Sequence, residues 1–314
     1  MTSRGVDISV LADHRMGKDL LDRHFESCIY RQEAGRALKL LVKKPPGWNP
    51  SDRRTAILWI HGGSWIGGEP EYFLPHCNYF AMRGMVACSV EYRLLESKGG
   101  GRGSTLIDCL QDCRAAVRYV REQADAWGID PDKIVVAGDS AGGHLAACLA
   151  TAVGFDIARE DAVRSGQPNA VVICNGIVDM TGKWREFVPS GQVATHVQKD
   201  DAVEGWMRHR GLCRRLSPLF NIDKGQPPML IMHGLEDKVA DPEQSVRLFE
   251  QYANAGNRAD LILYPSYDHA FILFGYQEKT ENVLGVLGDM DAWLCRMRFG
   301  DDVQRVGHEA FWQE

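Results

Sequence analysis

The segment at residues 134–144, which reads I-V-V-A-G-D-S-A-G-G-H, constrains the fold of this chain more than any other. Its first four residues are apolar and suit a buried strand, the glycine-rich stretch after them suits a sharp turn, and the apolar run from His144 suits a helix. Gly138 and Gly142 are needed in such a turn, because a Cβ at either position would clash with the neighbouring strand and helix. The turn would hold the Ser140 hydroxyl at the end of the strand, as in a nucleophile elbow. We therefore predict that Ser140 is a catalytic nucleophile rather than part of a plain strand-to-helix turn.

Length and composition are those of a globular α/β protein. With 314 residues, the chain can form one large domain over residues 1–314, which we expect, or two small domains, and a hydrophobic content of 45% allows a sizeable core. Its formal net charge is −6, and no cluster of lysine and arginine alternates with aromatic residues, so nucleic acid is not an expected partner. No uninterrupted apolar run approaches the length of a membrane span, so a membrane is not an expected partner either.

The cysteines and the N-terminus bear on the compartment. Nine cysteines are scattered along the chain, and Cys109 and Cys113, which share a helix face, have no histidine partners at metal-site spacing. This favours a reducing compartment and no structural metal. The charged N-terminus does not resemble a signal peptide, so we expect a cytoplasmic protein, and a trimmed secreted form is the alternative. The sequence leaves the oligomeric state open.

Short apolar runs alternate with helical patterns along the chain. The expected strands are residues 56–60, 85–90, 134–138, 170–174, 229–232 and 260–264. The expected helices are residues 106–127, 142–152, 242–255 and 280–298. Continuously apolar strands suit a sheet buried on both faces, and their alternation with helices predicts an α/β fold with a mostly parallel, doubly wound sheet flanked by helices.

Two stretches depart from this alternation. Residues 1–50 form an N-terminal extension that we expect to add a helix and antiparallel edge strands, one of them at residues 38–42. Residues 179–218 carry many charges and are interpreted as an insertion after the strand at 170–174. Such an insertion would emerge at the carboxyl edge of the sheet, either as a lid or pocket wall or as a surface excursion without function.

A nucleophilic serine needs a base and an orienting acid. Asp237 follows the expected strand at 229–232, and His269 follows the one at 260–264. Both lie just past strands, in the order serine, acid, histidine that hydrolytic sites on α/β sheets use. Of the ten histidines, only His269 follows a late strand, so we predict that it is the general base.

Three acidic residues compete for the orienting role: Glu236, Asp237 and Asp241. Asp241 has a structural alternative, because Pro242 and Gln244 after it resemble a helix start with a capping box. The residues alone leave this choice open.

Three other histidines are expected to be structural. His61 and His233 lie at strand ends, where hydrogen bonds that fix turns are the simpler interpretation. His144 lies on the helix after Ser140 and is expected to be a packed or capping group.

The loop H-G-G-S-W at residues 61–65 follows an early apolar strand. Acyl transfer needs preorganised N–H donors for the oxyanion, and glycines let the backbone curl close to a substrate carbonyl. We expect the backbone N–H groups of Gly63 and Ser64 to act as donors, together with that of Ala141 directly after the nucleophile.

Two further patterns are interpreted as structural. The run K-G-G-G-R-G-S at residues 98–104 lacks the G-K-[ST] ending of a phosphate-binding loop and is expected to be a flexible loop. Glu91 and Arg93, which follow a strand near the same edge, are expected to form a structural ion pair rather than to act as catalysts.

Several motifs together resemble the hormone-sensitive-lipase-like and the acetyl xylan and feruloyl esterase-like (BD-FAE-like) α/β-hydrolases, over roughly residues 35–297. The matching motifs are H-G-G-S-W at 61–65, E-Y-R-L at 91–94, G-I-D-P at 128–131, G-D-S-A-G-G-H at 138–144, S-P at 217–218, P-P at 227–228, H-G-x-x-D at 233–237 and D-H-A-F at 268–271. The resemblance implies an α/β-hydrolase fold with Ser140 as nucleophile, His269 as general base and then acid, and Asp237 as the orienting acid.

The same resemblance implies an oxyanion hole formed by Gly63, Ser64 and Ala141. The chain departs from many relatives at Ser64, where they have a third glycine. The backbone donor is kept, but the added side chain, with Trp65 beside it, suggests a restricted acyl pocket.

The leading functional hypothesis is a serine carboxylesterase that hydrolyses short-chain acyl esters, with acetylated sugars such as xylan among the candidates. Its expected partner is a small-molecule ester, and no cofactor or metal is expected. A kynurenine-formamidase-like small amidase is the alternative, because those enzymes also resemble H-G-G-x-W with G-x-S-x-G. A non-catalytic ligand-binding module is a third hypothesis, but similar plant hormone receptors have lost the histidine, whereas all three triad positions are filled here.

We expect acetyl to butyryl esters to be preferred, with activity falling steeply beyond about eight acyl carbons as buried apolar surface runs out. The rate is expected to rise with pH near the ordinary histidine pKa of roughly 6.5, because only a neutral imidazole can accept the serine proton.

Overall fold

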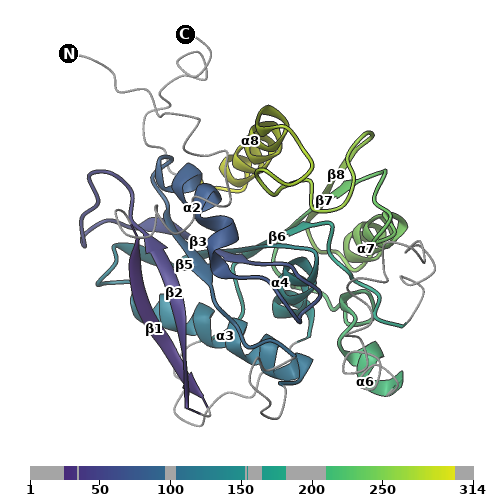
Figure 1. Cartoon of the computed structure of the whole chain (residues 1–314), viewed down its shortest axis with the longest axis horizontal. Helices are drawn as coiled ribbons and strands as arrows, with labels where there is room; N and C mark the ends of the chain where they lie inside the picture. The colour runs from purple at the N-terminus through teal and green to yellow at the C-terminus, as the bar shows by residue number, and fades with distance from the viewer. Residues whose placement is uncertain are drawn as a thin grey trace.

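One eight-stranded sheet runs through the molecule, in the order β1-β2-β4-β3-β5-β6-β7-β8 (Figure 1). The computed structural model describes residues 25–33, 35–95, 104–152, 154, 165–181 and 210–300. The pairs β1–β2 and β2–β4 are antiparallel, and every other neighbouring pair is parallel. The mostly parallel, doubly wound sheet is therefore the one that the sequence predicts.

The strands and helices fall close to the predicted ranges. The strands are β1 (Glu26–Glu33), β2 (Arg36–Lys43), β3 (Arg54–Ile60), β4 (Val86–Val90), β5 (Ile129–Asp139), β6 (Ala170–Cys174), β7 (Met229–Gly234) and β8 (Ala259–Tyr264). The α-helices are α2 (Leu74–Ala81), α3 (Leu106–Glu122), α4 (Ala141–Thr151), α6 (Arg210–Arg215), α7 (Glu243–Asn254) and α8 (Thr280–Arg296), with 3-10 helices at Pro70–Phe73 (η3) and Pro218–Phe220 (η8). Within the described ranges, every helix is too short or too polar to span a bilayer.

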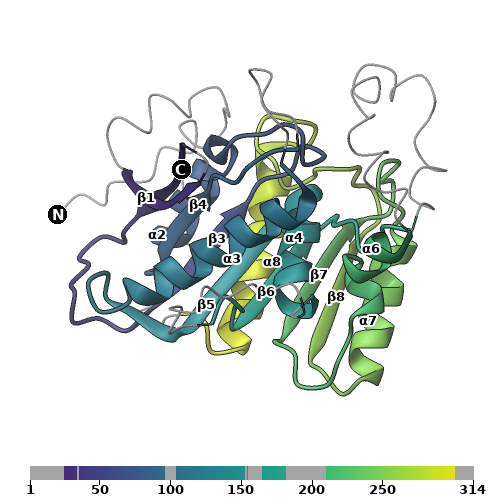
Figure 2. The same cartoon turned by 90° about the horizontal axis from the view of Figure 1, so that it is seen from below.

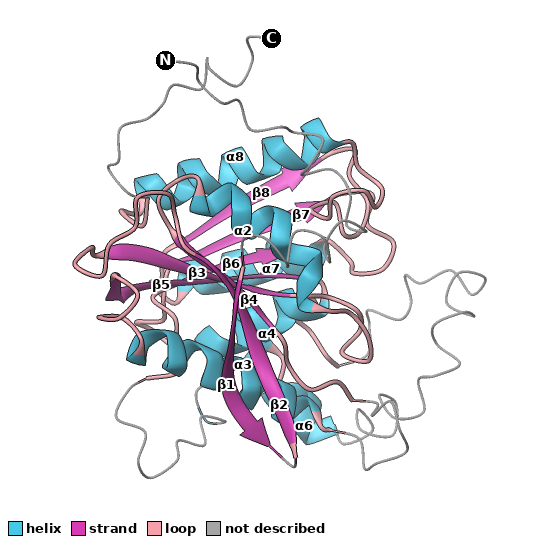
Figure 3. Ribbon diagram, turned by 60° about the vertical axis from the view of Figure 1, so that its left-hand side comes forward, coloured by secondary structure: helices cyan, strands magenta, loops and turns pink. Residues whose placement is uncertain are grey.

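The central strands are apolar throughout because both faces of the sheet are covered. Along β3, Leu58 and Ile60 face one buried cluster, and Ile57 and Trp59 face the other. The first cluster includes side chains of α3, α4 and α7, and the second includes those of α2 and α8. Figure 3 shows α2 and α8 on one side of the sheet and α3 and α4 on the other. Because these strands are parallel, their carboxyl ends lie together at one edge of the sheet (Figure 2).

The predicted helix at 106–127 and the predicted strand at 134–138 were wrong in extent, since β5 begins at Ile129. The predicted helix at 106–127 ends at Glu122, because the chain must turn into β5. That turn includes Gly128 at φ +62°, where a Cβ would lie 2.4 Å from the Asn49 carbonyl oxygen. The predicted edge strand at 38–42 lies inside β2, and β1 forms the edge of the sheet instead.

Other predictions concern segments that are only partly described. The helix expected in residues 1–50 does not occur in the described part from residue 35 to 50 or in β1, and residues 1–24 lie outside the description. Most of the predicted insertion at 179–218 and most of the predicted flexible loop at 98–104 also lie outside the described residues. The helix α2 and the 3-10 helix before it were missed by the sequence analysis.

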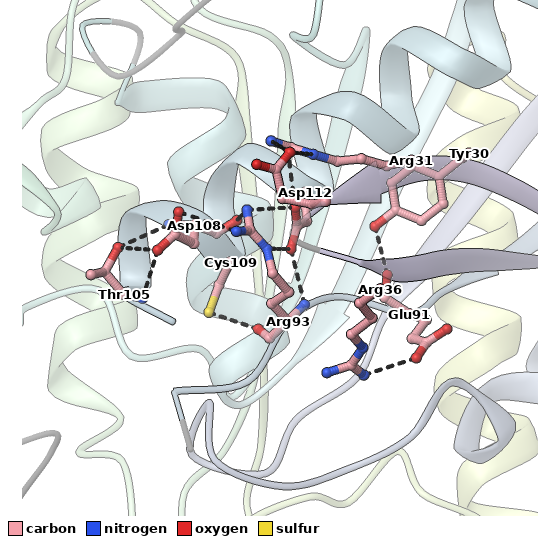
Figure 4. A network of polar contacts seen from close by, with 10 residues as sticks. Tyr30, Arg31, Arg36, Glu91, Arg93, Thr105, Asp108, Cys109 and Asp112 are labelled. Atoms are coloured by element: carbon pink, nitrogen blue, oxygen red, sulfur yellow. Dashed lines mark hydrogen bonds and ion pairs between the residues drawn. The ribbon is translucent and has the colours of Figure 1, made fainter. Parts of the chain in front are cut away.

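A buried carboxylate ties the N-terminal hairpin to the body of the protein (Figure 4). Asp112, on α3, has a fully buried side chain. Arg93 donates two hydrogen bonds to it, at 2.8 and 2.9 Å, and Arg31 on β1 lies 3.1 Å from it. Burial raises the pKa of Asp112, and the two guanidinium groups partly offset that desolvation. The carboxylate therefore holds together three segments that are distant in sequence.

Replacement of Asp112 should measure this contribution. We expect Asp112→Asn to lower the free energy of unfolding by about 3–5 kcal/mol, because it leaves two guanidinium groups without their buried counter-charge. Urea denaturation would measure the change. Asp125→Asn is the matched control, since Asp125 is 88% exposed in its pair with Arg53, and it should leave the unfolding midpoint unchanged. Equal midpoints for the two variants would contradict the prediction.

Candidate active site

Ser140 lies in a strained turn between β5 and α4. Its φ of 53° and ψ of −117° are outside the regions that most residues adopt. A Cβ on Gly138 would lie 2.2 Å from the Gly142 carbonyl oxygen, and one on Gly142 would lie 2.0 Å from the Ile60 carbonyl oxygen. Both glycines are therefore required by close backbone contacts, as the sequence analysis expected. The turn places the serine side chain at the carboxyl edge of the sheet.

The structure brings Ser140, His269 and Asp237 into one chain of hydrogen bonds. His269 Nε2 lies 2.9 Å from Ser140 Oγ, and His269 Nδ1 lies 2.7 Å from Asp237 Oδ2. These partners assign the tautomer: Nδ1–H donates to the carboxylate, and Nε2 accepts from the serine hydroxyl. Asp237 follows β7 and His269 follows β8, so parallel neighbouring strands deliver both residues to the serine. This is the arrangement that a nucleophilic serine requires.

The Asp237 carboxylate is held on both of its oxygens. Oδ1 accepts hydrogen bonds from the backbone N–H groups of Val239 and Ala240, each at 2.8 Å. Oδ2 accepts from His233 Nε2 at 3.1 Å in addition to His269. Burial disfavours the charge on Asp237, but the hydrogen bonds from the two histidines outweigh it and hold the pKa of the carboxyl well below its usual range. Asp237 is therefore ionised and fixed in orientation at neutral pH.

His269 is poised to take up a proton. Burial lowers the pKa of His269, but the hydrogen bond to Asp237 and the negative charges of Asp237 and Asp139 outweigh it, so the pKa lies above its ordinary value. A reaction that uses this imidazole as a base therefore gains rate at a higher pH than the value of about 6.5 expected from the sequence.

The loop that carries His269 is anchored by a second histidine. Ala270 has a positive φ of 58°, which turns the chain back toward the protein. Two residues further on, the Ile272 carbonyl contacts Nε2 of the buried His76 at 2.8 Å. The sequence analysis did not single out His76, because it lies on a helix that the apolar pattern did not predict.

The loop at 61–65 lies against the serine and exposes backbone donors. A Cβ on Gly62 would lie 2.8 Å from Asp139 Oδ2, so only glycine allows this approach. Gly63 and Ser64 have φ values of 114° and 52° and are exposed. Among the described residues, nothing accepts a hydrogen bond from the backbone N–H of Gly63, Ser64 or Ala141. These three groups are free to bind an anionic oxygen.

His61 fixes the conformation of that loop through contacts with Tyr92 and Gly62. Its ring stacks on Tyr92, with centroids 4.3 Å apart, and its Nδ1 lies 2.9 Å from the Gly62 carbonyl oxygen. The Tyr92 hydroxyl donates to the His61 carbonyl oxygen at 2.8 Å. His61 therefore has the turn-fixing role that the sequence analysis expected.

His233 and His144 are also structural. His233 is fully buried and links Asp237 to Ser245, whose hydroxyl lies 2.6 Å from Nδ1. His144 is fully buried, and its Nε2 lies 2.8 Å from the Leu216 carbonyl oxygen. Its ring packs edge-on against Trp65.

The competing acids are not placed to orient His269. Glu236 is exposed, and its backbone N–H pairs with the Tyr267 carbonyl. Asp241 accepts a hydrogen bond from the Glu243 backbone N–H at 3.0 Å, but it lies one residue before the N-cap of α7, which is Pro242 and not Asp241 as expected. The predicted capping box was wrong, because the Gln244 side chain instead accepts hydrogen bonds from the backbone of residues 178 and 179.

Two further expectations need correction. Glu91 and Arg93 do not pair with each other: Glu91 pairs with Arg36, and Arg93 pairs with Asp112. The Trp65 ring is only 1% exposed and belongs to the buried core, so it does not line an open acyl pocket. The Trp65 ring contacts that of the buried His144 instead.

Two buried polar residues beside His269 were not predicted from the sequence. Asn175, directly after β6, has its Nδ2 3.4 Å from His269 Nδ1. Asp139, the last residue of β5, is buried next to the nucleophile. The signal was available in both cases, because each is a polar side chain at the carboxyl end of an apolar central strand. No group of three or more histidine, cysteine, aspartate or glutamate side chains in the described ranges is arranged to hold a metal ion.

Comparison with known proteins identifies the family. Residues 47–252 match the family model described as BD-FAE. The chain belongs to the BD-FAE family. This membership, which covers more than half of the chain, confirms the resemblance drawn from the motifs and accounts for the α/β-hydrolase fold.

Relatives of this BD-FAE protein are named as esterases. An ethyl acetate hydrolase of Pseudomonas putida is 35% identical over 81% of this chain and 78% of its own length. Esterase LipC of Mycobacterium tuberculosis is 24% identical over 80% of this chain, which spans only 60% of LipC. Esterase 2 of Thermogutta terrifontis, solved with propionate bound, has a TM-score of 0.75 and 33% identity over 88% of this chain and 96% of that one. The same esterase has also been solved phosphonylated by sarin, with a TM-score of 0.77.

The choice of Asp237 over Asp241 as the orienting acid can be tested by substitution. We expect Asp237→Asn to lower the turnover of 4-nitrophenyl acetate by about 10⁴-fold, because an amide stabilises the wrong imidazole tautomer. Asp241→Asn should leave turnover within about twofold, because asparagine can accept the same hydrogen bond from the Glu243 backbone N–H. Steady-state kinetics on both variants, with melting temperatures as a check of folding, would measure this. A larger catalytic loss in Asp241→Asn would assign the orienting role to the wrong carboxylate.

Proposed function

We propose that this chain is a serine carboxylesterase that hydrolyses short-chain acyl esters through an acyl-enzyme on Ser140. The observation that carries the proposal is the continuous hydrogen-bond chain from Ser140 through His269 to Asp237, beside three unpaired backbone N–H groups. Membership of the BD-FAE family and the esterase names of its relatives support the reaction class.

In the first half of the reaction, Ser140 Oγ attacks the acyl carbon while His269 Nε2 takes its proton. The negative charge that develops on the carbonyl oxygen is stabilised by the N–H groups of Gly63, Ser64 and Ala141. Asp237 stabilises the imidazolium that forms. When the tetrahedral intermediate collapses, the ester C–O bond breaks, and the proton on Nε2 passes to the departing alcohol.

In the second half, water replaces the alcohol. His269 Nε2 takes a proton from the water as it attacks the acyl carbon, and the same three donors bind the oxyanion. Collapse breaks the bond to Ser140 Oγ, which regains its proton from the imidazolium. The carboxylic acid leaves, and the enzyme returns to its starting protonation state.

A short acyl chain is the substrate preference that we propose. The ethyl acetate hydrolase supports an acetyl group by its name, and the Thermogutta esterase has been solved with propionate and with butyrate bound. The exposed Ser64 side chain, where many relatives have glycine, adds bulk beside the proposed oxyanion donors. Trp65 no longer supports the proposal, since its ring lies in the core.

Covalent labelling tests the nucleophile. An organophosphate such as paraoxon should add one diethyl phosphoryl group, and mass spectrometry should find it on the peptide that carries Ser140. Ser140→Ala should remain unlabelled and lose turnover by several orders of magnitude, because the triad acts as a unit. Ser266→Ala, an exposed serine in the loop before His269, should be labelled and active like the unmodified protein. Labelling of Ser140→Ala at full stoichiometry would remove the mechanism.

A series of 4-nitrophenyl esters tests the acyl preference. We expect kcat/KM to be highest from acetyl to butyryl and to fall steeply beyond about eight carbons, because a small pocket cannot bury a longer chain. A maximum at decanoyl or longer would contradict the proposal. A higher kcat/KM for N-formylkynurenine than for any acetyl ester would favour the amidase alternative, and release of acetate from acetylated xylan would extend the proposal to sugar esters.

A further inference from the structure

A buried polar pair lies behind the imidazole and has no part in the proton transfers described above. Asp139 ends β5 and is 1% exposed, and Asn175 follows β6 and is fully buried. Within the described residues, Asp139 Oδ1 and Asn175 Oδ1 have no hydrogen-bond partner. Burying a carboxylate with so few donors costs stability, so its presence beside the candidate nucleophile calls for a role.

The backbone holds this pair in a fixed place. Asn175 has a φ of 39°, a left-handed conformation that asparagine tolerates better than most residues. Its N–H donates to the Met232 carbonyl at 2.9 Å, and the N–H of Ser140 donates to the Cys174 carbonyl at 3.0 Å. The nucleophile is therefore held to the end of β6, and Asn175, which follows β6, is held to β7. The Asn175 amide nitrogen lies 3.4 Å from His269 Nδ1. Both nitrogens are donors, because Nδ1–H is donated to Asp237, so the amide N–H is directed at the Asp139 carboxylate instead.

Three carboxylates interact electrostatically with His269 and favour its protonated form. Asp237 contacts Nδ1 from the loop after β7, and Asp139 approaches from the end of β5. Asp268, on the same loop as His269, accepts a hydrogen bond from the His269 backbone N–H at 2.7 Å. Burial raises the pKa of Asp139 to about 6, while His269 and Asn175 oppose that shift. Asp139 is therefore a second buried carboxyl beside the imidazole, and its ionised form adds negative charge there.

We propose that Asn175 and Asp139 are positioning residues for His269: the Asn175 amide holds the Asp139 carboxylate in place, and that carboxylate stabilises the imidazolium that forms in each proton transfer. The proposal rests on the function proposed above. A merely structural pair would maintain the turn after β6 without affecting the protonation of His269.

Charge and shape are separated by three variants. Asp139→Asn keeps the shape and removes the charge, so the acid limb of the kcat/KM profile should move to lower pH and kcat should fall about 10- to 100-fold. The charge-swapped Asp139→Asn/Asn175→Asp protein restores a carboxylate beside the ring, so its acid limb should return to the original pH or above. Asn175→Gly removes the amide without straining a positive φ, and it should lower kcat by about 10- to 100-fold with little change in KM.

Glu236→Gln is the matched control, because Glu236 is exposed on the loop next to Asp237. Its charge is screened by solvent, so its acid limb should coincide with that of the unmodified protein. Melting temperatures would verify that every variant is folded. An acid limb for Asp139→Asn that matches that of Glu236→Gln, or an Asn175→Gly kcat within twofold of the unmodified protein, would overturn the proposal.

Titration of His269 followed by NMR, in protein labelled with ¹⁵N-histidine, separates this proposal from the catalytic one. The imidazole of Asp139→Asn should titrate at lower pH than that of the unmodified protein, whether or not any ester is hydrolysed. If Ser140→Ala kept full esterase activity, the proposed function would fail. The titration would still measure the effect of Asp139 on the protonation of His269. If Ser140→Ala were inactive and the Asp139→Asn titration unchanged, only the positioning pair would fail.

Discussion

The contact between the turn at Ser140 and the end of β3 is the constraint on which the rest of the site depends. The backbone at Gly142 approaches the Ile60 carbonyl so closely that even one added carbon would lie 2.0 Å from its oxygen. Residue 61 follows directly, so the same contact places the loop of Gly63 and Ser64 over the serine. A turn that opened to admit a side chain would separate the candidate nucleophile from the N–H groups opposite it. Packing, rather than any strong attraction, thus sets the geometry of the site.

Hydrogen bonds and buried charges then fix the orientation and protonation of the side chains that the backbone brings together. The Asp237 carboxylate has four hydrogen-bond donors, two from its own loop and two from histidines, so neither its charge nor its orientation is left to solvent. His269 lies between this carboxylate and the serine, and a second buried carboxyl, Asp139, interacts with it electrostatically. Such an environment favours a proton on the imidazole, which is the state that every step of acyl transfer passes through.

Much of this arrangement could be predicted because it depends on local patterns. The central strands are apolar over their whole length, and Asp237 and His269 follow two of them directly. The pattern failed where structure depends on tertiary contact. Gln244 looks like half of a capping box, but it binds the backbone of residues 178 and 179, and Trp65 looks like a pocket wall, but it packs on His144. Neither partner is close in sequence, so no local rule could identify it.

Prolines in helices and polar residues at strand ends explain the remaining differences between the predicted and the observed structure. Pro70 and Pro75 interrupt the periodic pattern from which a helix is predicted. Each nevertheless lies in the first turn of a short helix, where proline is tolerated. Asn175 and Asp139 carry the same information as Asp237, a polar residue at the end of an apolar strand. A rule that examined the end of every central strand, rather than only the last two, would have found both.

The last strand of the sheet has a consequence for how the protein loses function. His269 is 129 residues from Ser140 in the chain, and it is delivered by β8. The residues of β8 are all partly exposed, and within the described part of the chain this strand pairs with β7 alone. Edge elements of this kind open at a lower free energy than the core of a sheet. A local opening of β8 would withdraw the imidazole while β3, β5 and β6 stayed intact. On heating, inactivation would then come before melting, and it would reverse on cooling as long as the inner strands held.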